Sequence, residues 1–172
     1  EYREALYGNL DDLKRMARMI ADMLFLAKAD NGLIAPERRP LALHELVEQL
    51  LDYYRLLAEE AGVVLAQGGE GWIAGEPGML RRALSNLLGN ALRYTPAGGC
   101  IRVRIGQRGG QVLLEVENPG PTIPAEHLGR LFDRFYRVDP ARREGGHAGL
   151  GLAITRSIVE AHRGSIRCTS AG

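Results

Sequence analysis

The sequence of 172 residues lacks any hydrophobic run long enough to cross a membrane. A helix that spans a bilayer needs about 20 mostly apolar residues, and charged residues interrupt every apolar stretch of this chain well before that length. The opening residues 1–4 are mostly charged and do not resemble a signal segment. We therefore expect a chain that folds in water and that is a piece of a longer protein.

Cysteine is scarce, and neither sign of charge dominates. Cys100 and Cys168 are the only cysteines, and they lie in strand-like runs without a Cys-x-x-Cys or Cys/His spacing. Such thiols are expected to be reduced and buried, which argues against a disulfide scaffold or a zinc site. The 22 lysines and arginines nearly balance 21 acidic residues, for a net charge of +1. We therefore expect no nucleic-acid partner, because no strongly basic face is present.

The common nucleotide-binding motifs are also absent. The sequence contains neither GxxxxGK(S/T) nor a GxGxxG that follows a strand, which excludes the P-loop and Rossmann folds. Strands grouped as hairpins, with helices on one side, predict instead a two-layer α/β sandwich. We expect helices over 43–61, 77–94 and 149–162, strands over 63–67, 71–74, 100–106, 111–117 and 165–170, and a hairpin turn at 107–110.

Two asparagines stand out in the predicted helix 77–94. Asn86 and Asn90 are four residues apart, so they lie one above the other on a face whose other positions are apolar. A buried amide needs a hydrogen-bonding partner or a metal ion. For an isolated pair the ordinary partner is loop backbone, so the pair alone leaves both alternatives open. Arg93 and Tyr94 follow with a cation and a flat ring that can lie on a base.

The stretch 119–148 shows no helical or strand pattern. A connection of this length is uncommon in a compact domain unless it forms a lid or a binding loop. We predict that Phe132 and Phe135 anchor one end of it. The glycines that close it allow backbone N–H groups to approach an anion, and the next helix, opening near Leu150, offers its N-terminal dipole. The arginines of this lid are Arg134, Arg137, Arg142 and Arg143, and its closing glycines are Gly145, Gly146, Gly149 and Gly151.

Four segments in a fixed order carry a family resemblance. They span 82–95, 118–124, 131–137 and 145–152. In that order they resemble the N, G1, F and G2 boxes of sensor histidine kinases, whose ATP-binding domain has the same fold as gyrase, Hsp90 and MutL-type ATPases. Each box alone is a weak signal, but four in order are specific. The resemblance implies the two-layer sandwich of that ATPase type, with ATP and Mg²⁺ as cofactors.

The run Glu117-Asn-Pro-Gly, together with residues 23–30, is most similar to the heavy-metal branch of these kinases, which covers copper, silver and cobalt-zinc-cadmium. This similarity implies a periplasmic metal-sensing domain outside the sequence. It also implies that the chain is a cytoplasmic domain of a bacterial inner-membrane protein, attached to the membrane only through upstream segments.

The resemblance assigns roles around the asparagine helix. Asn90 would coordinate the Mg²⁺ that bridges the phosphates, with Asn86 close by as a hydrogen-bonding partner, since amide oxygen is a hard ligand. Arg93 stands where the family usually has lysine and would contact phosphate with a planar fork. Tyr94 would stack near the adenine. Asn118 stands where most sensor kinases carry the aspartate that accepts from the adenine amino group, and an amide oxygen can accept the same bond.

The lid residues complete the implied ATP site. Arg137, with Arg142 or Arg143, would neutralise the γ-phosphate. Thr122 replaces an expected glycine and would stiffen the turn after Gly120. Phosphoryl transfer needs mostly positioning and charge neutralisation, so no protein nucleophile is expected within this domain. The other implied ATP-binding residues are Gly120, Ile123, Gly149, Leu150 and Gly151.

Residues 1–31 predict one long helix with two adjacent apolar seams. Two seams suit a four-helix bundle, in which each helix touches two neighbours. The resemblance makes this helix the second helix of a dimerisation and histidine-phosphotransfer domain, present in part, and implies a homodimer. A helix packed on its own domain is the alternative. The first seam consists of Leu6, Leu10, Leu13, Ala17, Ile20, Leu24 and Ala27, and the second of Met16, Met19, Met23 and Leu26.

A linker is predicted between this helix and the rest of the chain. An Asn-Gly pair at 31–32 ends the helix, and Pro36 and Pro40 bracket a charged stretch that cannot continue it. We expect a hinge over 32–40 and the catalytic ATP-binding domain over 41–172.

None of the four histidines has the setting of a kinase phosphoacceptor. In the family that residue lies in a His-Glu/Asp-Leu-Arg-Thr-Pro segment. His44 imitates the first three letters only, and we expect it on the polar surface of its helix. His127 and His147 fall in the lid, and His162 ends a helix, where the dipole favours an imidazolium. No histidine has a second ligand at metal spacing, so we expect no metal site built on them.

The sequence therefore predicts an ATP-binding kinase domain that transfers the γ-phosphoryl group to a histidine upstream of this chain, and from there to an aspartate of a response regulator. One alternative is another ATPase or serine kinase of the same fold, although the two-seam helix argues against it. The other is a non-catalytic dimerisation module, which the departures at Arg93, Asn118 and Thr122 keep open.

Overall fold

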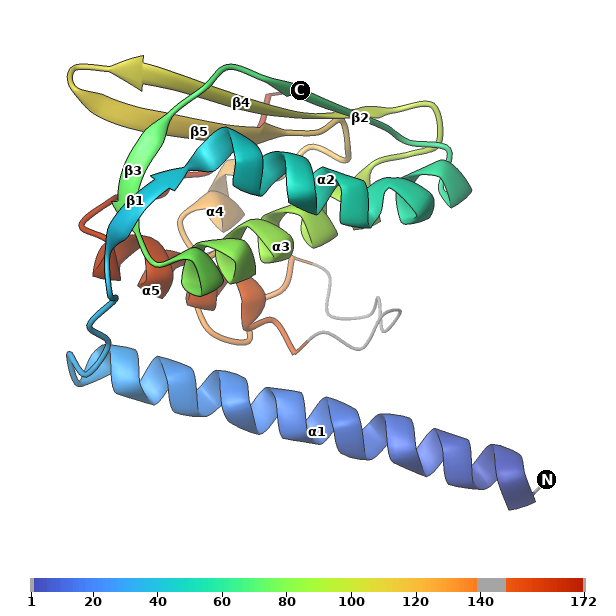
Figure 1. Ribbon diagram of the computed structural model, residues 1–172. Helices are drawn as coiled ribbons and strands as arrows, with labels where there is room; N and C mark the ends of the chain where they lie inside the picture. Colours follow the sequence, from blue (N-terminus) through green and yellow to red (C-terminus); the bar gives the residue numbers. More distant parts are fainter. Residues whose placement is uncertain (1, 139–147, 172) are drawn as a thin grey trace.

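The computed structural model describes residues 2–138 and 148–171 and contains five helices and five strands (Figure 1). The helices are α1 (Tyr2–Asp30), α2 (Leu43–Glu60), α3 (Pro77–Tyr94), α4 (Ala125–Leu128) and α5 (Gly151–Ala161). The strands are β1 (Arg39–Ala42), β2 (Val64–Gly68), β3 (Trp72–Gly75), β4 (Cys100–Arg108) and β5 (Gln111–Glu117). None of the helices described is long and apolar enough to cross a membrane.

The strands form two sheets, and the larger one is covered by helices on one face. Its order is β2-β4-β5, with β2 parallel and β5 antiparallel to β4, while β1 and β3 pair as a separate antiparallel ribbon. Helices α2, α3 and α5 lie together beneath the larger sheet (Figure 1). This arrangement is the predicted two-layer α/β sandwich.

Alternation along β4 explains which face of the sheet is covered. Ile101, Val103 and Ile105 are buried, whereas Arg102 and Arg104 between them are exposed. In a sheet that is covered on one side, a strand with period two buries one face and leaves the other in water. The buried face packs on the helical layer, whose main core residues are Leu46, Val47, Leu50, Leu84, Leu88, Ile154 and Ile158.

The hairpin between β4 and β5 is tighter than predicted. We expected the turn over 107–110, but β4 continues to Arg108 and the turn consists of Gly109 and Gly110. Both have a positive φ, 59° and 78°, and this conformation suits the twist of a two-residue hairpin turn and favours glycine.

Beyond shifts of one or two residues at the ends of elements, three features differ from the prediction. Strand β1 begins inside the expected linker 32–40 because it finds a partner in β3. The short helix α4 interrupts the stretch that showed no pattern. The strand predicted over 165–170 is wrong, since no ladder pairs it with β5; instead the Ser170 hydroxyl accepts a hydrogen bond from the Ile123 N–H at 3.0 Å. A strand-like pattern without a paired neighbour does not become a strand.

Helix α1 is covered only near its C-terminal end. Leu26 is 2 % exposed and belongs to the domain core, and α1 contacts α5. Arg82 of α3 pairs with Asp22 at 2.5 Å and lies over the Phe25 ring at 4.6 Å. The rest of the helix extends below the helical layer toward the N-terminus (Figure 1). Among the seam residues whose exposure the structure describes, the alternative of packing on its own domain therefore holds for Met19 and Leu26 of the second seam and for none of the first.

Two predictions about polar side chains are corrected by burial. His44 is half-buried rather than fully on the surface: it lies in the first turn of α2, its ring meets Trp72 edge-on at 5.8 Å, and its buried Nδ1 has no hydrogen-bond partner among the residues that the structure describes. The free thiols Cys100 and Cys168 are half-buried rather than buried. Burial raises the pKa of the Cys168 thiol.

Candidate functional site

Helix α3 carries the central residues of the site and is fixed at its start and along its length. The Glu76 carboxylate caps it by accepting hydrogen bonds from the N–H groups of Gly78 and Met79, at 3.1 and 2.6 Å, which satisfies two of the unpaired donors of the first turn. The Tyr54 hydroxyl of α2 donates to the Ser85 carbonyl at 3.2 Å. Burial raises the pKa of Tyr54. These contacts hold α3 against α2.

Asn86 joins α3 to the start of α5. Its Nδ2 donates to the Gly151 carbonyl at 3.0 Å and lies 3.4 Å from the Thr155 hydroxyl. Thr155 is fully buried, and its hydroxyl donates to the same Gly151 carbonyl at 2.9 Å. This small network places the N-terminus of α5 beside the asparagine face of α3. Sequence analysis missed Thr155, although a threonine among the apolar residues of the predicted helix 149–162 was the available signal.

Asn90 lies one turn beyond Asn86 and is half-buried. Its side-chain amide makes no hydrogen bond to any residue in the described part of the chain. An amide that the fold positions but does not use is available to an external ligand. Its oxygen is the kind of donor that Mg²⁺ accepts, so the residue fits the predicted ligand chemistry.

Arg93 and Tyr94 form the end of α3. The Arg93 guanidinium lies 5.9 Å from the centre of the Tyr94 ring, within the range of a cation–π contact. Tyr94 is 45 % exposed, so much of its ring remains open to solvent. The helix stops at Thr95, whose hydroxyl donates to the Ala91 carbonyl at 2.6 Å. This end of α3 therefore presents a cation and an aromatic surface side by side.

Gly120 brings the loop after β5 against that end of α3. A Cβ at this position would lie 3.0 Å from the Tyr94 carbonyl oxygen and 3.4 Å from Asn118 Nδ2, so a larger residue would push the loop away. The Nδ2 of Asn118 donates to the Pro119 carbonyl at 3.1 Å, which leaves its Oδ1 as an acceptor. Ile123 follows in the same loop and is tied to Ser170 through its N–H. The structure thus brings Tyr94, Asn118 and Gly120 together.

Gly149 joins the two described ends of the lid. Its φ is +72°, and its carbonyl accepts a hydrogen bond from the Phe135 N–H at 3.0 Å. A Cβ at 149 would lie 3.0 Å from the Phe135 Cα and carbonyl carbon, so only glycine allows this approach. Phe135 was predicted to anchor the lid through its ring, but the side chain is 53 % exposed and the anchor is its backbone. Phe132 is half-buried.

The N-terminus of α5 has no side-chain cap. Leu150 occupies the capping position, is 2 % exposed and cannot accept a hydrogen bond from the first-turn N–H groups. Unpaired N–H groups and the positive end of a helix dipole together favour an anion. Gly151 is the first residue of this helix, and its carbonyl is the acceptor for Asn86. The sequence placed this helix start at 149, two residues early.

Two of the four lid arginines, Arg134 and Arg137, are described by the structure. Arg134 is committed to Asp30 of α1, with Nη2 2.5 Å from Oδ1. Arg137 is half-buried and already has an interaction partner. Arg142 and Arg143 lie outside the described residues, as do Gly145, Gly146 and His147.

His162 corrects another prediction. Its Nε2 accepts a hydrogen bond from the Glu76 N–H at 3.0 Å, so Nδ1 must carry the proton that it shares with the Ile158 carbonyl at 2.7 Å. The ring is therefore a neutral imidazole that links the end of α5 to the start of α3, and not an imidazolium held by the helix dipole. His127 contacts the Tyr136 hydroxyl at 2.5 Å and takes no part in the site.

Comparison with known proteins gives three close similarities. The sensor histidine kinase CusS of Escherichia coli O6:H1 is 55% identical over 172 residues, which are 99% of this chain and 36% of CusS. The sensor protein CopS of Pseudomonas syringae pv. tomato is 52% identical over 152 residues, covering 88% of this chain and 31% of CopS. The structure of full-length ShkA in complex with AMPPNP has a TM-score of 0.80 at 25% identity, covering 92% of this chain and 34% of that one.

These similarities confirm the predicted resemblance to sensor histidine kinases of the heavy-metal branch. The chain spans about a third of the length of the curated relatives it matches. Residues 75–172, which contain every predicted nucleotide-binding residue, match the model of the histidine kinase-, DNA gyrase B-, and HSP90-like ATPases. The helical layer, the asparagine face of α3 and the uncapped start of α5 are parts of one ATPase fold. The chain therefore belongs to that ATPase family.

Proposed function

We propose that this chain is the ATP-binding catalytic region of a sensor histidine kinase, with residues 41–172 as the catalytic domain, 32–40 as the linker and 1–31 as part of the dimerisation domain. It would transfer the γ-phosphoryl group of ATP to a histidine that is not among the four of this sequence, and from there to an aspartate of a response regulator. The observation that carries the proposal is the Asn86–Gly151 hydrogen bond, because it sets an uncapped helix start beside the unused amide of Asn90.

Phosphate binding follows from that geometry. The N–H groups of the first turn of α5 would donate to phosphate oxygens, and Gly149 and Gly151 leave room for the backbone to approach them. Arg93 and Arg137 would supply positive charge, and the Asn90 oxygen would hold Mg²⁺. When bound, Mg²⁺ neutralises charge on the phosphates. The protein itself positions and shields the transferred group, which is most of what phosphoryl transfer requires.

Adenine recognition is proposed at the junction of α3 and the loop after β5. The exposed Tyr94 ring offers a stacking surface, and Asn118 Oδ1 would accept from the adenine amino group. Gly120 and Ile123 would line the same side. ShkA, whose structure contains the ATP analogue AMPPNP, supports an adenine nucleotide as the ligand.

The partners and the cellular context are part of the same proposal. The exposed seam of α1 would pair with a second copy of the kinase, and the phosphorylated histidine would serve a response regulator receiver domain. The relatives CusS and CopS are named as sensors, and by analogy the whole protein would be a bacterial inner-membrane sensor of heavy metals with this region in the cytoplasm. These relatives favour a sensor kinase over a serine kinase or a gyrase-type ATPase.

The first experiment tests the metal and phosphate site. Asn90→Ala should lower the affinity for Mg-ATP by about 1–3 kcal/mol without changing the melting temperature, because the amide makes no hydrogen bond to a residue that the structure describes. Isothermal titration calorimetry measures this, with Asn9→Ala on the exposed surface of α1 as the matched control. Equal affinities for the two variants would remove Asn90 from the site.

The adenine contact has its own test. Asn118→Asp keeps an acceptor at the same place and should bind ATP at least as well as the native chain, whereas Asn118→Leu should bind it more weakly. If leucine at 118 leaves the affinity unchanged, the base lies elsewhere.

The transfer step separates a kinase from an ATPase or an inert module. The chain alone should bind ATP but incorporate no acid-labile phosphate, His44 included, whereas a phosphotransfer hairpin with the His-Glu/Asp-Leu-Arg-Thr-Pro segment, added in trans, should become labelled. Phosphoserine or steady ATP turnover would instead support another ATPase of this family. Failure to bind Mg-ATP at all would support the non-catalytic module.

A further inference from the structure

Strand β2 is an edge of the larger sheet. The order β2-β4-β5 gives it one neighbour, and no other strand in residues 2–138 and 148–171 pairs with its outer side. An edge strand presents unpaired backbone donors and acceptors, which proteins usually cover or block with lysine, proline or a bulge. Strand β2, with the sequence Val-Leu-Ala-Gln-Gly, contains none of these blocking side chains.

The register shows which backbone groups face outward. Val64 donates its N–H to the Gly99 carbonyl at 2.9 Å, on the β4 side. Because the N–H and C=O of successive residues point to opposite sides of a strand, Val64, Ala66 and Gly68 face β4. The N–H and C=O of Leu65 and Gln67 therefore point away from the sheet. These two residues can therefore form backbone hydrogen bonds with an added strand.

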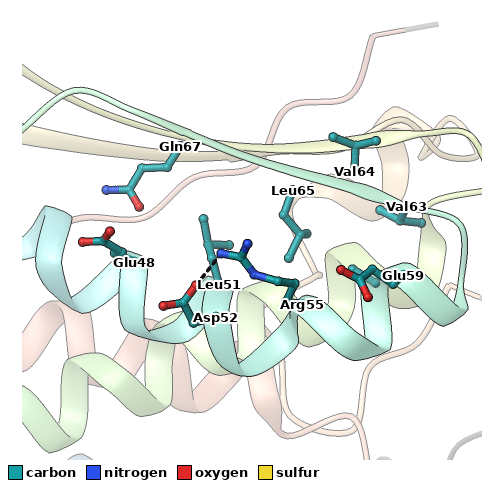
Figure 2. A pocket seen from close by; sticks show the side chains of 10 residues that line it. Glu48, Leu51, Asp52, Arg55, Glu59, Val63, Val64, Leu65 and Gln67 are labelled. Atoms are coloured by element: carbon teal, nitrogen blue, oxygen red, sulfur yellow. Dashed lines mark hydrogen bonds and ion pairs between the residues drawn. The ribbon is translucent and has the colours of Figure 1, made fainter.

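A groove runs between this edge and helix α2. It has a volume of about 450 Å³ and lies below β2 and beside the outward face of the helix (Figure 2). Its apolar wall consists of Leu51 and Ala58 from α2 and Val63 and Leu65 from the strand side. Figure 2 shows the Leu65 side chain pointing from β2 toward α2. A strand added to β2 would therefore place alternate side chains over an apolar floor.

The helix side of the groove carries excess negative charge. Its charged residues are Glu48, Asp52 and Glu59 against the single cation Arg55, which gives a net charge of −2. Arg55 is already paired with Asp52, Nη2 to Oδ1 at 2.5 Å (Figure 2). The carboxylates of Glu48 and Glu59 have no ion-pair partner among the residues that the structure describes. Two unpaired carboxylates thus mark the two ends of the groove.

We propose that this groove binds an extended basic segment of a partner protein, which adds to β2 as a fourth strand and places lysine or arginine beside Glu48 and Glu59. The backbone edge supplies the hydrogen bonds, the apolar floor accepts alternate side chains, and the carboxylates select for cations. This mode of recognition combines main-chain pairing with side-chain pockets.

The spacing of the carboxylates sets the pattern of the partner. Glu48 and Glu59 are 11 residues apart in α2, which corresponds to about 16 Å along a helix. An extended chain covers that length in about five residues. Side chains on one face of a strand recur every second residue, so the two cations are expected four to six positions apart, with apolar side chains at alternate positions between them.

The test uses a fluorescein-labelled peptide of sequence Lys-Thr-Val-Thr-Val-Thr-Lys, which puts both lysines and both valines on one face, and the 172-residue chain. Fluorescence anisotropy should show saturable binding, and an analogue with both lysines replaced by glutamine should bind roughly fivefold more weakly. In ¹⁵N-correlated NMR spectra the amide signals of Leu65 and Gln67 should shift on titration. The combined change of Glu48→Lys and Glu59→Lys should weaken binding about tenfold, more so at low salt.

Two matched pairs of variants separate recognition from folding. Gln67→Pro removes an outward N–H and should weaken binding about tenfold, since proline is tolerated at a solvent-facing edge but cannot extend the ladder. Gln67→Ala loses only the side-chain hydrogen bond to the His44 carbonyl and should bind normally. Glu60→Lys, an exposed carboxylate that does not line the groove, is the control for charge reversal.

Three results would overturn the proposal. One is the absence of saturable peptide binding by a folded chain. Another is equal binding by the native chain, the Glu48/Glu59 double variant and Gln67→Pro. The third is self-association that Gln67→Pro abolishes and the peptide does not compete with, which would assign this edge to a second copy of the chain.

Discussion

Helices α1 and α3 have the same kind of amphipathic pattern and opposite environments. In α3 the apolar face is covered by α5, α2 and the sheet, and its buried residues include Leu84 and Leu88. In α1 six large apolar side chains are 46–63 % exposed, while Leu26 near the end is 2 % exposed. The six are Leu10, Leu13, Met16, Ile20, Met23 and Leu24. A periodic pattern thus predicts that a face will be covered, but not whether the same chain covers it.

The polar residues of the two helices differ in the same sense. In α3, Asn86 donates a hydrogen bond to the start of α5, whereas the Asn90 amide has no hydrogen-bond partner among the described residues and is proposed as a Mg²⁺ ligand. Near the C-terminal end of α1 the polar residues form ion pairs with the catalytic domain. Asp22 pairs with Arg82, and Asp30 pairs with Arg134. We therefore propose α3 as the element for ligand binding and α1 as the surface for assembly. Four experiments test that division.

The largest effect is expected from a charge in the covered face. Leu84→Asp buries a carboxylate among apolar residues and should destabilise the domain by more than about 4 kcal/mol, enough to unfold much of it at room temperature. Leu13→Asp makes the same change at a 63 % exposed position and should leave the unfolding free energy nearly unchanged. Urea titration followed by circular dichroism compares the two. Similar losses would mean that α1 is as much a part of the domain fold as α3.

The next prediction concerns assembly. Leu13→Asp combined with Ile20→Asp should abolish self-association of the chain in analytical ultracentrifugation and leave Mg-ATP affinity intact, because two charges would enter the expected helix bundle. Leu33→Asp, outside α1 and 70 % exposed, is the control. A native chain that stays monomeric at high concentration would contradict the assembly role of α1.

A smaller effect should come from the link between the start of α3 and the end of α5. His162→Ala removes one acceptor and one donor and leaves the Glu76 N–H unpaired, so we expect a loss of about 1–3 kcal/mol in unfolding free energy. Arg156→Ala, which loses only an exposed pair with Glu160 on the same helix, should leave it nearly unchanged. Equal stabilities would show that this link does not hold α3.

The smallest effect is expected where α1 meets α3. Arg82→Ala removes a half-exposed ion pair with Asp22 and a cation–π contact with Phe25, worth about 1 kcal/mol together. Global stability should change little, but hydrogen exchange in the end of α1, residues 22–30, should accelerate. Arg81→Ala breaks an exposed hydrogen bond to Gln49 instead and should leave that exchange unchanged. Accelerated exchange in both variants would rule out a specific contact.

Much of the fold was accessible from the sequence because periodicity and turn chemistry are local. Helix α3 was predicted over its full range, 77–94, since its apolar residues recur at helical spacing. Strand β1 was missed because its residues, Arg39–Ala42, gain strand geometry only from pairing with β3. The expected strand 165–170 failed for the converse reason, since its alternation was present but its partner was not.

The site was predictable as a set of residues and not as a network. Asn86 and Asn90 were singled out from their residue type and spacing, and Asn118 from the family resemblance. Their different uses were not, because the hydrogen bond of Asn86 spans 65 positions to Gly151. Similarly, the role of His162 depends on Glu76, 86 residues away. Contacts over such separations leave no trace in a local pattern.

The two neighbours of β4 have a consequence for the order in which the domain forms. Strand β5 follows β4 directly through a two-glycine turn, whereas β3 and α3 lie between β2 and β4 in the sequence. Loop closure costs more entropy for the distant pair, so we expect the hairpin in the folding transition state and β2 docking later. Gly110→Ala, at φ +78°, should then slow refolding, whereas Val64→Ala should mainly speed unfolding. Stopped-flow chevron plots distinguish these outcomes, and the strand that docks last would be the one with an open edge.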